Sequence, residues 1–170
     1  MTITCTLSTQ SLMAAAKQLR EYARSLDDKA DNLVRKLGEY GSEMALEHFN
    51  EAPHIDTGNT IDSIGYTHRG HSGTVAVGGA AVWIEFGTGV AKNGGNAGAY
   101  VHEKASELGM DAIGTYGKGH GANLGGWFYP GTDGKYHHTF GIASNPFMYK
   151  SSQDMRRELL DIAKEVFKND

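Results

Sequence analysis

The sequence predicts an α+β fold, in which a long N-terminal helix and a C-terminal helix pack on a small, mostly antiparallel β-sheet, with a long Gly-rich loop insertion. Three observations support this fold class: a long apolar stripe at helical spacing, two stretches of β-branched and aromatic residues that are interrupted by turn residues, and a second amphipathic stretch near the C-terminus. A chain of 170 residues is long enough to bury a core. We therefore expect a single domain over residues 1–170, with residues 91–141 as an insertion.

Composition limits the classes of partner. The net charge is −4 and the pI is near 6.0, so nonspecific attraction to nucleic acid or to an anionic membrane is not expected. The single cysteine, Cys5, excludes an internal disulfide and a cysteine-based zinc site. No apolar run approaches the roughly 20 residues of a membrane span, and the N-terminus lacks the pattern of a signal peptide. We expect a protein that is made and assembled in a cytoplasm, with no membrane partner.

The N-terminal residues predict a short strand followed by the start of a helix. Residues 2–7 alternate threonine with apolar side chains, which is the period of a strand. Ser8, Thr9 and Ser11 then offer caps for a helix N-terminus.

The long helix that follows is the clearest element. Its narrow apolar stripe consists of Leu12, Leu19, Ala23, Leu26, Ala30, Leu33 and Leu37. About 28 helical residues span roughly 40 Å, more than a domain of this size needs to cover, so we expect one end of the stripe to pack on a neighbouring subunit. Packing on the chain's own sheet is the alternative. Gly38 and Gly41 predict a break or kink, after which the helix continues to Ala52 and ends at Pro53.

The segment after this helix predicts a turn and a hairpin. Asp56 is placed to form an Asx-turn closed by Gly58. We expect one strand over residues 61–66 and its return over residues 74–77, ending at two glycines. Residues 80–86 are compatible with a short helical turn or with the start of a strand.

The insertion contains 13 of the 23 glycines, and its centre has almost no apolar residues. A loop of this length is typically functional or mobile. Residues 101–110 predict a short helix, and residues 127–140 predict a second hairpin around a Pro-Gly turn. The aromatic residues of this hairpin are either core or anchors of a contact surface, and the candidates for such a surface are Trp127, Phe128, Tyr129 and Tyr136.

The C-terminal stretch predicts a helix that runs to about Lys168. Asn145 is the expected N-cap and Pro146 the expected first-turn residue. Its apolar face consists of Phe147, Met155, Leu159, Ile162, Val166 and Phe167.

Glu85 is an unusual residue because large apolar side chains surround it in the sequence. An ionised carboxylate in such a place must be hydrogen-bonded or paired. We expect the backbone N–H groups of a tight turn at Gly87 and Gly89 to be its partners. A structural role is favoured over that of a catalytic acid, since no second carboxylate or histidine lies beside it at a working spacing.

No motif of catalysis or of metal binding is present. The chain has eight histidines, but no pair has the i, i+4 spacing of a zinc protease, and His137 and His138 point to opposite faces of a strand. The glycine-rich stretches do not match a phosphate-binding loop, and no nucleophile elbow occurs. We therefore expect no catalytic residue, no metal and no cofactor, with a histidine-based metal hydrolase as a distant alternative.

Three motifs in order resemble the HK97 gp10-like family of structural proteins of tailed phages and prophages. The first is a Pro-hydrophobic-Asp-Thr-Gly stretch with an extra histidine, the second an aromatic-hydrophobic-Glu-Phe-Gly-Thr stretch, and the third a Pro-Phe-Met helix start. The residues that carry the resemblance are Pro53, Asp56, Thr57, Gly58, Trp83, Glu85, Phe86, Gly87, Thr88, Pro146, Phe147 and Met148. The chain departs from the compact members of the family in the length of its 91–141 insertion.

The resemblance implies a non-enzymatic protein of the virion, at the head–tail junction or the top of the tail, called a head–tail connector, neck or tail-completion protein. Such proteins assemble as rings, so the implied partners are other copies of the chain, neighbouring neck or connector proteins, and tail tube or terminator proteins. No specific nucleic-acid binding is implied, and assembly takes place in the host bacterial cytoplasm. The alternative is the tail terminator of a contractile tail or of a bacteriocin-like particle. We further expect the 91–141 loop to order against a neighbour.

Overall fold

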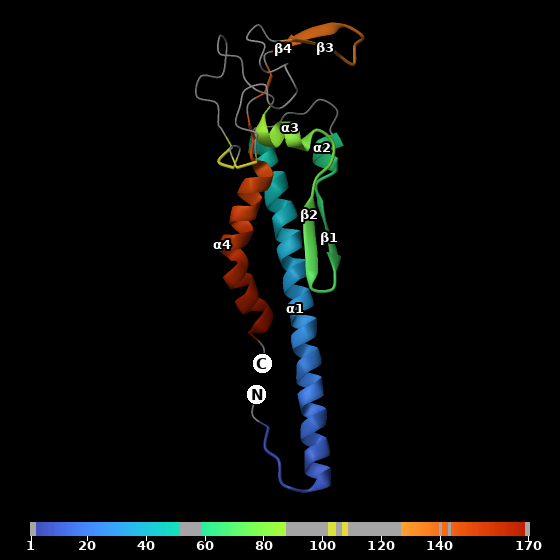
Figure 1. Ribbon diagram of the computed structural model, residues 1–170, viewed down its shortest axis with the longest axis vertical. Helices are drawn as coiled ribbons and strands as arrows, with labels where there is room; N and C mark the ends of the chain where they lie inside the picture. Colours follow the sequence, from blue (N-terminus) through green and yellow to red (C-terminus); the bar gives the residue numbers. More distant parts are fainter. Residues whose placement is uncertain are drawn as a thin grey trace.

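The computed structural model describes residues 3–51, 59–87, 102–104, 107–108, 127–139, 141–142 and 144–168, without the side chain of Trp127. A single long helix, α1, forms the axis of the molecule (Figure 1). The predicted α+β class is confirmed, with a long N-terminal helix, a C-terminal helix and small antiparallel sheets. The elements in order are α1 (Thr9–Glu51), α2 (Asn59–Asp62), β1 (Gly65–Arg69), β2 (Ser72–Ala76), α3 (Ala81–Phe86), β3 (Trp127–Pro130), β4 (Tyr136–Thr139) and α4 (Phe147–Phe167).

The start of α1 is capped as the sequence predicts. The Ser8 hydroxyl accepts the backbone N–H of Ser11 at 3.2 Å, which satisfies one of the free donors of the first turn. The predicted N-terminal strand is wrong, because residues 3–6 are not in a strand. The alternation of threonine with apolar residues does not make a strand without a neighbour to pair with. The N–H of Thr6 is instead donated to the Ser11 hydroxyl at 2.9 Å.

The predicted break at Gly38 and Gly41 is also wrong, since α1 continues for 43 residues without interruption. A Cβ atom on Gly38 would lie 2.5 Å from the Tyr66 ring, and one on Gly41 would lie 2.4 Å from the Met155 sulfur. The Gly41 carbonyl also accepts the hydroxyl of Ser151 at 2.6 Å. Glycine costs a helix about 1 kcal/mol relative to alanine. Here it allows the β1–β2 hairpin and α4 to approach the helix backbone closely.

The first hairpin forms where the sequence predicts it. β1 and β2 are antiparallel, with Gly65 opposite Ala76 and Arg69 opposite Ser72, and Gly70 takes a left-handed φ of 53° in the turn. The strand was expected from Ile61, but residues 59–62 form the helical turn α2 instead. This turn is closed by Ser63, whose hydroxyl donates to the Thr60 carbonyl at 2.7 Å.

The hydrophobic core lies at the C-terminal end of α1. α4 packs chiefly against α1, and the β1–β2 hairpin packs against another side of the same helix (Figure 1). The rings of Phe49 and Phe147 meet edge to face, with centroids 5.3 Å apart. Among the described residues, the buried apolar ones come from α1, α3 and α4 and are Ala45, Phe49, Ala81, Ile84 and Phe147. The sequence left a helical turn and a strand start open for residues 80–86, and the structure has the helix α3 there.

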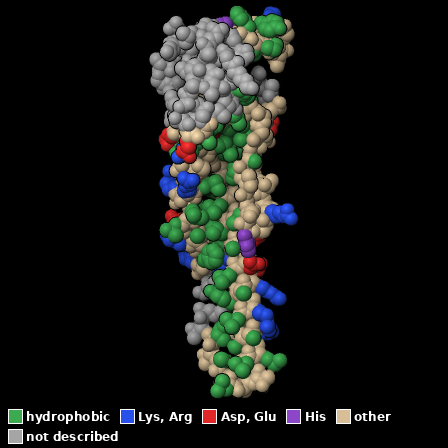
Figure 2. Space-filling model, viewed as in Figure 1, with side chains coloured by type: hydrophobic (Ala, Val, Ile, Leu, Met, Phe, Trp, Pro, Cys, Tyr) green, Lys and Arg blue, Asp and Glu red, His purple; other side chains and the backbone are tan. Residues whose placement is uncertain are grey.

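The N-terminal half of α1 extends beyond the rest of the fold. The hairpin reaches Asp27 through His71 at 3.1 Å, and α4 reaches Lys29 through the Phe167 ring at 5.9 Å. Below these contacts only the N-terminal coil accompanies α1 in Figure 1, and Figure 2 shows hydrophobic side chains on its surface. Leu12 and Leu19 are 48% and 57% exposed. Packing of this end on a neighbouring subunit remains a prediction, and the exposure is what such packing requires.

The second hairpin also forms as predicted. β3 and β4 are antiparallel, with Trp127 opposite Thr139 and Pro130 opposite Tyr136. Gly134 takes a left-handed φ of 75° in the connecting turn. No described helix is long and apolar enough to cross a membrane.

Several predictions lie outside the described residues. These are the Asx-turn with Pro53, Asp56, Thr57 and Gly58, the motif residue Thr88, and most of the 91–141 insertion.

Candidate functional site

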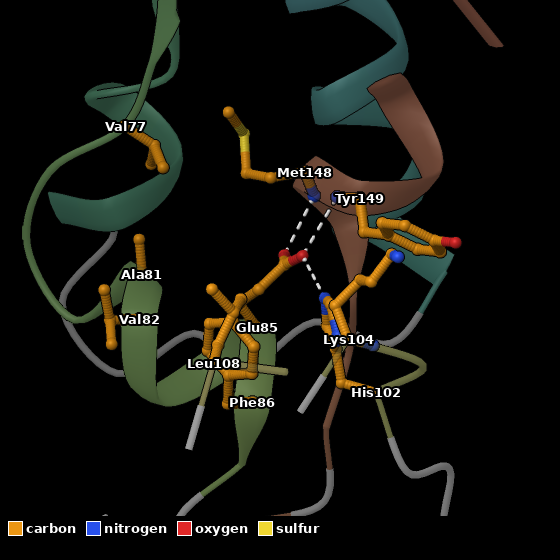
Figure 3. A pocket seen from close by; sticks show the side chains of 10 residues that line it. All are labelled: Val77, Ala81, Val82, Glu85, Phe86, His102, Lys104, Leu108, Met148 and Tyr149. Carbon is orange, nitrogen blue, oxygen red and sulfur yellow. Dashed lines mark hydrogen bonds and ion pairs between the residues drawn. The ribbon is translucent and has the colours of Figure 1, made fainter. Parts of the chain in front are cut away.

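Glu85 joins α3 to the N-terminus of α4. Ala81, Ile84 and Glu85 occupy the buried face of α3, and Glu85 is 7% exposed. One carboxylate oxygen accepts the backbone N–H of Met148 and the other accepts that of Tyr149, both at 2.9 Å (Figure 3). These donors belong to the first turn of α4, which has no intrahelical partner for them. Glu85 therefore caps α4 from another element and places a negative charge at the positive end of the helix dipole.

His102 completes this arrangement, which we call the Glu85 clamp: Glu85, His102, and the N–H groups of Met148 and Tyr149. The His102 Nε2 lies 3.0 Å from a Glu85 oxygen. Its Nδ1 accepts the N–H of Lys104 at 2.9 Å, so the ring proton is on Nε2 and is donated to Glu85. The imidazole packs between the rings of Phe86 and Tyr149, with centroid distances of 4.4 and 5.1 Å.

The expected structural role of Glu85 fits this geometry, and its partners among the described residues differ from the turn that the sequence predicts. Among the described residues, the carboxylate accepts hydrogen bonds from His102 and from two N–H groups of α4, and none from Gly87. Gly89, the other expected donor, lies outside the described residues. Gly87 has a φ of 75°, a conformation that favours glycine, and ends α3. Nothing near Glu85 in the sequence identifies His102, which is 17 residues away, as its partner.

Asn145 does not cap α4 as predicted. Pro146 occupies the N-cap position, and the Asn145 side chain donates to the carbonyls of His48 and Phe49 at 3.3 Å. The Asn145 N–H is donated to the Ile84 carbonyl at 2.8 Å, and the Ser144 hydroxyl to the Glu85 carbonyl. The residues before α4 thus connect the end of α1 to α3, while Glu85 takes over the capping role.

A pocket of about 400 Å³ adjoins the clamp. Its volume lies in the range of small-ligand sites. Its charged lining groups are already engaged, Glu85 in the clamp and Lys104 in an ion pair with Glu107 at 2.7 Å. The remaining lining is apolar or aromatic and consists of Val77, Ala81, Val82, Phe86, Leu108, Met148 and Tyr149, with His102 of the clamp. Such a lining suits an apolar side chain better than a polar substrate.

The other motif residues lie around the same junction. Phe147 is fully buried against Phe49, and Met148 lines the pocket. Trp83 is 37% exposed on α3. The hairpin aromatics are not part of this site, and Phe128, Tyr129 and Tyr136 are 65%, 43% and 74% exposed.

His48 forms a second polar cluster, where α4 packs on the end of α1. Its Nε2 lies 2.6 Å from Asp154 and its Nδ1 lies 2.8 Å from Glu51. Lys150 pairs with Glu51, and Arg157 pairs with Asp154. Burial by itself lowers the pKa of His48, but the hydrogen bonds to Asp154 and Glu51 outweigh it and raise the pKa above the ordinary 6.5. The hydrogen bonds from Lys150 and His48 lower the pKa of Glu51.

This cluster makes the stability of the fold depend on pH. The folded-state pKa of His48 lies above its unfolded value of 6.5, so its contribution is fully present below pH 6.5. That contribution is lost as the pH rises through the raised pKa. We expect the free energy of unfolding of the wild type to fall over this range relative to that of His48→Gln, in urea titrations at a series of pH values. Parallel curves for the two proteins would contradict this assignment.

The histidines that the structure describes do not gather around a metal site. Within the described ranges there is no group of three or more His, Cys, Asp or Glu side chains that could hold an ion. Four of these histidines pair with one carboxylate each, as His68–Asp31, His71–Asp27, His102–Glu85 and His137–Asp133, and His48 pairs with two, Glu51 and Asp154.

Comparisons of the chain with protein-family models, with curated proteins and with solved structures found no match.

Proposed function

We propose that this chain is a structural protein of a tailed phage or prophage particle, located at the head–tail junction or the top of the tail. In this role it is a neck or tail-completion protein that assembles in a ring and makes or breaks no bond. The observation that carries the proposal is the exposed apolar surface on two projecting elements, the N-terminal half of α1 and the β3–β4 hairpin. A protein with apolar projections of this kind is suited to contact its neighbours.

The contacts of the Glu85 clamp support this proposal. Two of the three motifs that carry the family resemblance are joined there, since Glu85 of the second motif binds the N–H of Met148 in the third. Phe147 of the third motif packs in the core beside Ile84 of the second. The described residues Ile84, Glu85, Phe147 and Met148 of these two motifs thus have a common physical task, which is to hold α3 and α4 against the end of α1.

The β3–β4 hairpin is suited to contact a neighbouring connector, tail tube or terminator protein. Phe128 and Tyr136 lie on the same face of this hairpin, because residues directly opposite each other or two apart share a face. Both side chains are mostly exposed. A two-stranded hairpin is marginally stable alone in water, and large aromatic side chains are typical anchors of interfaces.

The test is deletion of the coding sequence from the phage or prophage that carries it, with complementation from a plasmid. We expect filled heads and separate tails in the deletion and joined particles after complementation, as seen by electron microscopy. Cross-linking within complemented particles then identifies the neighbours and separates a neck position from that of a tail terminator. Normal infectious particles without this protein would refute the proposal.

A further inference from the structure

We propose that the free half of α1, residues 9–26, packs on the half-covered part of α1, residues 26–37, in a second copy of the chain. Repeated around an axis, this head-to-tail contact closes the ring. The inference rests on the proposed function, which supplies the expectation of a ring. It goes further by naming the two surfaces of α1 that meet between neighbouring copies.

The apolar stripe of α1 has the repeat of a coiled-coil seam. Its positions are separated by alternating steps of four and three residues, which is the heptad spacing that keeps one face towards a partner helix. Each heptad contributes two positions to the seam. Leucine occupies one of them throughout, and alanine occupies the other in the first three heptads. The seam consists of Leu12, Ala16, Leu19, Ala23, Leu26, Ala30, Leu33 and Leu37.

The chain itself covers this seam incompletely. Leu26, Ala30, Leu33 and Leu37 are partly buried, and none of them is fully buried. Leu12 and Leu19 are about half exposed. Figure 2 shows hydrophobic side chains gathered along this side of the molecule, over α1 and α4 and down to the free end of α1. One continuous seam is thus available, half covered at one end and uncovered at the other.

A second copy suits this seam in repeat and in size. Knobs-into-holes packing requires a partner helix with the same alternation of three and four residues. The alanines leave room for two helix backbones to approach closely. Residues 9–26 span about 27 Å at 1.5 Å per residue, which exceeds the roughly 18 Å of residues 26–37, so the free half is long enough to cover the exposed seam.

The charges of the free half are complementary to those of the first turns of the receiving segment, residues 27–31. The free half carries three basic side chains, Lys17, Arg20 and Arg24, against one acidic side chain, Glu21. Residues 27–31 carry three acidic side chains, Asp27, Asp28 and Asp31, against one basic side chain, Lys29. Two further basic side chains, Arg35 and Lys36, lie beyond these turns at the other end of the receiving segment. A staggered contact places the basic half of one copy beside the acidic turns of the next. An in-register parallel pair would place like charges together, which is unfavourable.

The test is self-association of the full-length protein, measured by sedimentation over a concentration series. We expect an assembly whose dissociation constant rises about tenfold or more in Leu19→Asp, as expected when a central apolar anchor is replaced. Leu160→Asp is the matched control, because this leucine is 64% exposed on α4 outside the seam, and it should assemble like the wild type. Leu19 is exposed in the single chain, so circular dichroism should show an unchanged fold.

A charge exchange tests the stagger. Arg24→Glu should weaken assembly several-fold, and adding Asp28→Lys should recover part of the loss if the two segments meet.

A wild type that stays monomeric at every concentration, or a Leu19→Asp variant that assembles like the wild type, would overturn the inference. If deletion still gives unjoined heads and tails while Leu19→Asp complements fully, the proposed function stands without this contact. If the seam drives assembly but the particles do not need the protein, the contact stands and the proposed function fails.

Discussion

Replacing Glu85 with alanine is expected to lower the free energy of unfolding by roughly 3–5 kcal/mol, as for removal of one partner from a buried charged network. The substitution leaves the N–H groups of Met148 and Tyr149 without their acceptor in a buried place. It also leaves the Nε2 proton of His102 without its partner. The measurement is urea unfolding followed by circular dichroism, with stability taken from the transition midpoint.

Glu85→Gln separates the capping role from simple packing. Glutamine keeps the shape but has one acceptor oxygen, so its amide N–H group must face one of the three donors. We expect this variant to be destabilised, though less than Glu85→Ala. The control is Glu43→Ala, an exposed carboxylate on α1, which should change stability by no more than about 0.5 kcal/mol. If Glu85→Ala matches this control, the clamp does not hold α3 to α4.

Phe147→Ala is expected to cost about 3–5 kcal/mol, because it removes a fully buried aromatic ring from the core and leaves a cavity. The ring packs edge to face on Phe49, so the loss includes an aromatic pair as well as buried area. Phe147 also begins α4, where the Glu85 clamp acts. The same urea titration measures the change.

The matched control for this substitution is Leu160→Ala on the same helix. Leu160 is 64% exposed, so its truncation should change stability by less than about 0.5 kcal/mol. Equal effects of the two substitutions would mean that the end of α1 is not the centre of the core. A large effect of Phe147→Ala alone supports the junction of α1, α3 and α4 as the most cooperative part of the fold.

These two substitutions bear on assembly as well as on stability. The clamp and the core lie at one end of α1, whereas Leu12 and Leu19 lie at the other. Stability and self-association are therefore separable by mutation. The Leu19→Asp variant is expected to fold but not to assemble. Glu85→Ala, by contrast, is expected to lower the stability of the fold itself.

The sequence by itself determined the elements whose signals are local. The periodic leucines predict the long helix, Ser8 predicts its start, and the glycine between Arg69 and Ser72 fits a tight hairpin turn. The need of Glu85 for partners also follows from its apolar neighbours, since a buried carboxylate must be hydrogen-bonded. Each of these inferences depends on residues a few positions apart.

Only the tertiary structure decided which groups meet. Gly38 and Gly41 resemble helix breakers, yet they are sites where Tyr66 and Met155 pack on an unbroken helix. Glu85 caps α4, which begins more than 60 residues later in the chain, and accepts a hydrogen bond from His102. The physical reason is that local periodicity describes which face of an element is apolar but contains no information about the element that covers it. Close approach and capping depend on contacts between distant segments, and these exist only once the chain has folded.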